Sequence, residues 1–172
     1  MRPLHGNYLQ VARSEDSVYV LVSGQGNMIN STTFKDFVDE MLRKSYHTFV
    51  LDLKACTGLD STFMGLIAGI TQFETKDTRT RVIVVNAPDI CKRLLTDIGL
   101  CNFITLSDRA FEDPGVELQV LEPVELDPKA RVKLIHQAHT KLVEIDARNE
   151  AKFGAFLKML TREMGSEETP SN

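Results

Sequence analysis

The run Asp60-Ser61-Thr62 stands where an apolar strand pattern gives way to an apolar helical pattern. Residues 48–53 are nearly continuous in apolar β-formers, which is typical of a strand buried on both faces. A loop is expected over 54–59, and apolar residues at helical spacing begin after Asp60. We therefore expect both hydroxyl groups in the first turn of a helix, at the carboxyl end of a buried strand, where ligands and partners bind in open α/β sheets.

The first turn of a helix is chemically suited to carry a phosphate. Its N–H groups lack partners within the helix and carry a partial positive charge, so a phosphate is stabilised there. Phosphorylation of Ser61 would add about −1.5 to −2 units of charge without disrupting the helix. A partner docked over this surface would meet that charge next to Asp60, so the pattern predicts a binding switch. The same run is also a good N-terminal cap, worth about 1 kcal/mol, and that purely structural interpretation stays open.

The periodicity of the rest of the chain predicts the elements that position these hydroxyls. Strands are expected at 8–13, 18–22, 48–53, 81–85 and 103–106, and helices are expected after caps at 30–33, from residue 60, and over 89–98. This alternation predicts an α/β fold with a mostly parallel sheet, helices packed on it, and the first strand as an antiparallel edge. The segment 23–27 is expected to break the second strand.

The chain changes character after the last predicted strand. Four segments are expected: a domain at 1–111, an irregular connector at 112–128 with one extended piece at 116–121, a helical extension at 129–164, and a disordered tail at 165–172. Asp146 and Asn149 interrupt the apolar stripe of the extension, which predicts either one long helix with a polar gap or two helices in a hairpin. The stripe must be buried on the chain's own sheet or helices, in a homodimer, or on a separate partner.

Composition restricts the classes of function. Net charge is −4 with both signs mixed along the chain, which argues against a nucleic-acid surface. No apolar run is long enough for a membrane helix and no signal peptide is apparent, so we expect a cytoplasmic protein. The odd set Cys56, Cys91 and Cys101 contains no CxxC pair, which favours reduced thiols.

The run from Leu51 to Gly65 resembles the signature of the STAS domain (sulfate transporter and anti-sigma factor antagonist). That signature is a strand ending in Asp-Leu, a short loop, and Asp-Ser-Ser/Thr-Gly-Leu-Gly at a helix start. Residues 22–24 resemble the strand and glycine turn that precede the family's first helix, and 86–103 resembles its third helix and last strand. The resemblance covers residues 8–111 and implies a STAS-like fold.

The resemblance also implies a function, that of an anti-sigma factor antagonist with no enzymatic activity of its own. The serine after the aspartate is the phosphoacceptor, here Ser61, with Thr62 at the adjoining hydroxyl. An anti-sigma factor serine kinase adds the phosphate, a PP2C-like phosphatase removes it, and the unmodified domain binds the anti-sigma factor. No cofactor or metal is implied. We expect the partner-binding surface to comprise Gly24, Asn27, Gly58, Asp60, Ser61, Thr62 and Phe63.

Two residues depart from the family pattern. Phe63 replaces a glycine, and its ring is expected either to fill the core or to extend over the contact surface. Asn27 stands where an acidic residue is common. These departures and the long extension keep a second hypothesis open, a non-phosphorylated scaffold that assembles through its C-terminal helices.

Other kinds of chemistry have weaker support in the sequence than the Ser61 switch. The glycines of 24–26 suggest a dinucleotide loop, but the third glycine of that motif is missing. Asp52 ends a strand like an aspartyl phosphatase nucleophile, although the second carboxylate is replaced by Lys54. His136 and His139 are three residues apart on a predicted helix, without a matching ligand cluster for a metal, and no histidine is obviously placed as a base for Ser61.

Overall fold

The computed structural model describes residues 6–108 and 115–166. The strands are β1 (Tyr8–Arg13), β2 (Ser17–Gly26), β3 (Thr48–Asp52), β4 (Cys56–Leu59), β5 (Arg81–Val85), β6 (Thr105–Ser107) and β7 (Gln119–Leu121). The helices are α1 (Met28–Arg43), α2 (Ser61–Thr71), α3 (Asp89–Asp97), α4 (Pro128–Ile145) and α5 (Asn149–Ser166), with a 3₁₀ turn η1 (Leu100–Asn102). Within the described part, no helix is both long and apolar enough to cross a membrane.

The strands form one mixed sheet in the order β6-β5-β3-β2-β1-β7, with β4 paired to the far end of β2. The pairs joining β2, β3, β5 and β6 are parallel, while β1 is antiparallel to β2. The predicted α/β fold with a mostly parallel sheet is therefore confirmed. The first strand is not the edge as predicted, because β7 pairs antiparallel with its outer side. The short apolar piece within 116–121 thus covers an edge that β1 would otherwise leave open.

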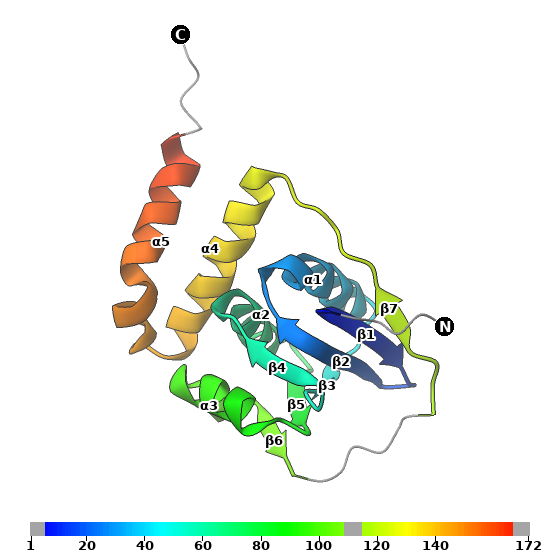
Figure 1. Ribbon diagram of the computed structural model, residues 1–172. Coiled ribbons are helices and arrows are strands. Elements are labelled where there is room, and N and C mark those ends of the chain that lie inside the picture. The colour runs from blue at the N-terminus through cyan, green and yellow to red at the C-terminus, as the bar shows by residue number, and fades with distance from the viewer. Residues whose placement is uncertain (1–5, 109–114, 167–172) are drawn as a thin grey trace.

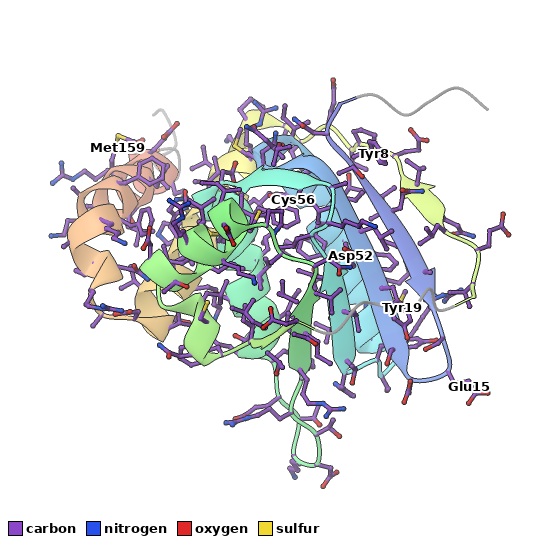
Figure 2. The ribbon with its side chains drawn as sticks, turned by 60° about the horizontal axis from the view of Figure 1, so that its bottom comes forward. Tyr8, Glu15, Tyr19, Asp52, Cys56 and Met159 are labelled. Carbon is purple, nitrogen blue, oxygen red and sulfur yellow. The ribbon has the colours of Figure 1, made fainter. Side chains whose placement is uncertain are left out.

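Two further boundaries differ from the prediction because backbone partners extend the strands. The segment 23–27 does not end β2: Gly24 adopts a left-handed backbone with φ 71° at a bulge, and β2 continues to Gly26 by pairing with β4. The predicted loop at 54–59 is therefore partly the strand β4. In Figure 2, Cys56 of β4 and Asp52 of β3 lie toward one end of the sheet, and Glu15 in the hairpin turn lies at the other.

The first helix begins earlier than the caps at 30–33 predicted. The Asn27 side chain accepts from the backbone N–H groups of Ile29 and Asn30, and the Asn30 side chain accepts from the N–H of Asn27. This capping box starts α1 at Met28, so Asn30 and its three successors lie within the helix, where all four are buried. In α3, Cys91 is buried and the neighbouring Ile90 is exposed.

The C-terminal extension is a pair of helices, so the hairpin alternative is confirmed. Asn149 fixes the corner, because its side-chain amide donates to the carbonyl of Ile98 at 2.9 Å and to that of Leu142 at 2.7 Å. In Figure 1, α4 lies beside α2 and α5 is outermost, farthest from the sheet. Figure 2 likewise places Met159 of α5 far from the sheet. The described part of the tail, Gly165 and Ser166, continues α5, and the remainder of the expected disordered tail lies outside the described residues.

The contact between α2 and α4 depends on a backbone approach at Gly65. A Cβ at this position would overlap the carbonyl group of Ala138, which is backbone and cannot rotate away. At Gly69, one turn further along α2, an added Cβ would only reach ordinary contact with the Lys141 side chain at 3.8 Å. The docking of α4 therefore requires glycine at position 65 but not at position 69.

These two glycines give a matched pair of variants. Gly65→Ala should lower the free energy of unfolding by about 1–3 kcal/mol, the usual cost of overpacking. Gly69→Ala should leave it unchanged or raise it by up to about 1 kcal/mol, since alanine favours the helix. Thermal unfolding followed by circular dichroism measures both, and equal midpoints for the two variants would contradict the close helix crossing.

Candidate functional site: the rim around Ser61

The predicted hydroxyls lie on a rim formed by the ends of β2 and β4 and the starts of α1 and α2. The backbone N–H of Asp60 donates to the carbonyl of Gly26 at 2.8 Å, which ties the end of one strand to the start of α2. Asp60 is the N-cap of α2 and Ser61 is its first residue, as predicted. We call this surface the Ser61 rim and define it by Gln25, Asn27, Ile29, Thr57, Gly58, Asp60 and Ser61.

Asp60 caps two helices at once. One carboxylate oxygen accepts from the backbone N–H of Phe63 at 2.8 Å, and the other accepts from that of Met28 at 2.7 Å. Each N–H belongs to the first turn of a helix, where no intrahelical acceptor is available. The partial positive charges of the α1 and α2 N-termini thus both face this carboxylate. Asp60 was predicted as part of the partner surface; the structure shows that it also joins the two helices.

Graded substitutions at position 60 test this double cap. Asp60→Asn keeps an acceptor oxygen for one N–H group, whereas Asp60→Ala removes both acceptors. We expect the free energy of unfolding to fall in the order Asp, Asn, Ala, with a total loss of about 1–4 kcal/mol because each cap contributes about 0.5–2 kcal/mol. Urea unfolding measures the series, and an alanine variant as stable as the parent chain would refute the double cap.

The Ser61 hydroxyl has a partner that the sequence did not suggest. Its Oγ lies 2.8 Å from Nε2 of His139, which α4 contributes. The other ring nitrogen, Nδ1, lies 2.8 Å from the carbonyl oxygen of Ile135 and must carry a proton, because that oxygen can only accept. In the neutral ring Nε2 is then the acceptor, and the Ser61 hydroxyl donates to it. The sequence showed no histidine obviously placed as a base for Ser61, and the structure corrects this, because His139 lies within hydrogen-bonding distance of the hydroxyl.

His139 is held rigidly and is only 3% exposed. The rings of Phe153 and Phe156 on α5 meet it edge-on, each with a centroid distance of 5.0 Å. Burial lowers the pKa of His139; the Ile135 carbonyl and the Asp60 charge oppose this shift, and His136 adds to it. The ring is therefore neutral at neutral pH, as its hydrogen bond with Ser61 requires.

The lowered pKa of His139 predicts a pH dependence of stability. The unfolded chain, with an ordinary histidine pKa of about 6.5, binds the proton at a higher pH than the folded chain does. The contribution of neutral His139 to stability is therefore fully present above about pH 6.5 and declines as the pH falls below that value. Urea unfolding between pH 7.5 and pH 5, at fixed ionic strength, measures the slope.

His139→Asn should flatten this slope relative to the parent chain. His136→Asn is the matched control. His136 is on the same helix as His139, but its side chain contacts Thr161 and not Ser61. Parallel slopes for the parent chain and His139→Asn would show that His139 is not the buried group responsible.

The other predicted partner-binding residues divide into surface and structural positions. Phe63 is fully buried and stacks on Phe34 with a centroid distance of 4.7 Å, so it fills the core and is not on the contact surface. Thr62 is 5% exposed, which leaves Ser61, half-buried, as the more accessible hydroxyl. Gly58 is half-buried on the rim.

Gly24 and Asn27 have structural partners at the rim. The N–H of Gly24 donates to the carbonyl of Ala55 at 2.9 Å, and the bulge at this glycine allows β2 to reach β4. Asn27 uses its side chain to cap α1. Both residues therefore shape the rim, and partner contact by either stays a prediction.

One exposed apolar residue of the rim was missed by the sequence analysis. Ile29 lies in the first turn of α1 and is 69% exposed, next to the half-buried Met28 whose N–H contacts Asp60. Its position three residues after Gly26, on the polar side of the helix pattern, was the available signal. Gln25 and Thr57 are the exposed polar residues of the same rim.

The alternative chemistries find no support in the geometry. The glycines of 24–26 form part of β2, and the N–H of Gln25 donates to the Asn7 side chain, so these groups do not form a phosphate-binding loop. The carboxylate of Asp52 accepts from the N–H of Lys54 and from the Asn86 side chain. Among residues 6–108 and 115–166, no three His, Cys, Asp or Glu side chains are grouped to hold a metal.

Comparison with known proteins places this fold and rim in a family. The STAS domain profile matches residues 8–112. No curated protein sequence matches the chain significantly. The chain belongs to the STAS domain family, and the family match ends before α4, so His139 lies outside it.

Solved structures share this fold. A structure titled as an anti-sigma factor antagonist from Thermotoga maritima matches with a TM-score of 0.52 and 24% identity, covering 58% of this chain and 86% of that one. The anti-sigma factor antagonist SpoIIAA in its unphosphorylated form matches with a TM-score of 0.52 and 15% identity, covering 58% and 88%. An anti-sigma factor antagonist from Mycobacterium paratuberculosis matches with a TM-score of 0.52 and 20% identity, covering 61% and 88%.

Proposed function

We propose that this chain is a cytoplasmic anti-sigma factor antagonist, a binding protein rather than an enzyme, whose partner contact is controlled by phosphorylation of Ser61. The proposal rests on one observation above all. Ser61, which is half-buried, is the first residue of α2 and lies on the rim where the strands β2 and β4 end. STAS membership and the named role of the similar proteins, anti-sigma factor antagonists, support the same role.

The rim suits a charge-controlled interaction. The α2 N-terminus favours a phosphate on Ser61, so the domain itself tolerates the modification. A partner seated over Ile29, Thr57 and Gly58 would bring its own surface against about −1.5 to −2 units of charge close to Asp60. The expected partners are an anti-sigma factor serine kinase, which binds the unmodified rim, and a PP2C-like phosphatase, which restores it.

Phosphosite mapping after incubation with ATP and a cognate anti-sigma factor serine kinase tests the acceptor. We expect the phosphate on Ser61, and phosphate elsewhere than on Ser61 or Thr62 would contradict the proposal.

Binding of that same kinase, measured by calorimetry, tests the switch. Ser61→Ala should keep the affinity within about threefold, whereas Ser61→Asp should weaken it by at least about tenfold, which corresponds to about 1.4 kcal/mol. Thr78→Asp, in an exposed loop beyond the other end of α2, carries the same charge as a control. Equal affinities for the two aspartate variants would contradict a charge effect at the rim.

The scaffold alternative depends on the outer face of α5. Met159 is 53% exposed and Met164 is 37% exposed on that helix, while α4 is already packed on α2. A homodimer through the C-terminal helices therefore stays a prediction, and it would form through the exposed face of α5. Light scattering measures the mass of the protein in solution and thus tests it.

A further inference from the structure

The hydroxyl proposed as phosphoacceptor is already engaged by a part of the chain outside the family match. His139 accepts its proton at 2.8 Å, and the backbone of Ala138 lies against Gly65 one turn further along α2. The α4–α5 hairpin thus lies along the first two turns of the helix whose start carries the rim. The STAS match ends at residue 112, so this cover is an addition to the part of the chain that the family profile describes.

We propose that the α4–α5 hairpin is an intramolecular cover for the Ser61 hydroxyl, and that a kinase reaches this hydroxyl only when α4 leaves α2. The rest of the Ser61 rim, with Ile29 69% exposed, stays open to a partner. This inference rests on the proposed role of Ser61 as phosphoacceptor. It adds a regulatory step to that role: His139 and the kinase compete for the same hydroxyl.

The chemistry of phosphoryl transfer makes docking and modification mutually exclusive. The reaction joins the γ-phosphorus of ATP to Oγ, breaks the bond between that phosphorus and the β,γ-bridging oxygen so that ADP leaves, and transfers the hydroxyl proton to a base of the kinase. In the docked form that proton is directed to Nε2 of His139, and the buried imidazole occupies the space next to Oγ. Three phosphoryl oxygens on Oγ would need the same space, so α4 must separate from α2 before or during the transfer.

The hairpin is built to move as a unit. His139 is packed between Phe153 and Phe156, so the two helices keep a contact of their own when α4 leaves α2. The corner is tied to the end of α3, where the Lys152 side chain donates to the carbonyl of Asp97 at 2.7 Å and Asn149 donates to that of Ile98. At the other end, the exposed segment 122–125 is held to α1 by the Thr33 hydroxyl, which donates to the carbonyl of Glu122 and accepts from the N–H of Val124, both at 3.1 Å. The residues that turn when α4 opens are therefore those between Val124 and the start of α4.

The docked position of α4 on α2 is the favoured state in the absence of a partner. Ala138 and Leu142 of α4 are buried at 1% and 0% exposure, and opening would return this apolar surface to water. Coupling between two sites is reciprocal. If the docked hairpin protects Ser61, then charge on Ser61 must weaken the docking of the hairpin to the same extent.

Thiol labelling measures protection of the site without any kinase or partner. Ser61→Cys is reacted with N-ethylmaleimide, and peptide mass spectrometry separates position 61 from the buried Cys56 and Cys91 and the half-buried Cys101. Adding Gly65→Ala, which displaces α4, should raise the labelling rate of position 61 at least tenfold. Adding Gly69→Ala should leave that rate within about twofold. Equal rates in all three chains would overturn the proposal.

Hydrogen exchange measures the reverse effect. Ser61→Asp should speed the exchange of amides over 134–142 at least tenfold relative to the parent chain, while amides of β3 and β5 stay protected and show that the sheet is folded. Ser61→Ala removes the hydrogen bond without adding charge and should have a smaller effect. Thr57→Asp places the same charge at an exposed rim position and should have none. Equal protection of α4 in the parent and Ser61→Asp would overturn the proposal.

The proposed hairpin cover and the proposed phosphorylation switch are refuted by different results. Labelling and exchange depend only on the hairpin, so unchanged rates would remove the cover and leave the phosphorylation switch intact. Phosphosite mapping depends on the kinase, so a phosphate found elsewhere would remove the proposed function even if α4 protects position 61.

Discussion

The carboxylate of Asp60 is the contact on which the rest of the site depends. Two helices that start at distant points in the chain each donate one first-turn N–H group to this carboxylate. The N–H of Met28 in α1 lies at 2.7 Å and that of Phe63 in α2 at 2.8 Å. The backbone N–H of the same residue binds the end of β2. One side chain and its own peptide group therefore set the relative positions of a strand end and two helix starts, and Ser61 occupies the next position. The geometry of the hydroxyl follows from that arrangement.

The sheet and the central site were predictable from the sequence because local signals agree with the fold. The apolar run at β3, the alternation of strand and helix patterns, and the aspartate before an apolar helix each point to the same architecture. The boundaries that failed depend on distant partners. Strand β4 exists because β2 bends at Gly24 to meet it, and β7 exists because β1 has an open edge. Neither pairing has a signature within its own residues.

The His139 contact could not be assigned from the sequence, although part of it was visible. A histidine within the apolar stripe of α4 requires a hydrogen-bonding partner once it is buried. The stripe alone does not say which of many hydroxyl or carbonyl groups supplies it. That depends on the crossing of α4 and α2, which the backbone contact between Gly65 and Ala138 sets. The hairpin and its docking on the chain's own helices were both among the predicted alternatives, but the sequence did not indicate α2 as the helix that it contacts.

The departure at Phe63 has a consequence for how this chain can vary. The ring stacks on Phe34, and a Cβ at Gly26 would meet Phe63 at 2.9 Å and Leu59 at 2.8 Å. The bulky aromatic and the bare backbone at the end of β2 therefore fit together as a pair, although 37 positions of sequence separate residues 26 and 63. In relatives with glycine in place of the aromatic, the crowding from position 63 is absent, and a side chain at position 26 meets only the flexible end of the residue at position 59. The two positions should consequently covary across the family, with a large side chain present at no more than one of them.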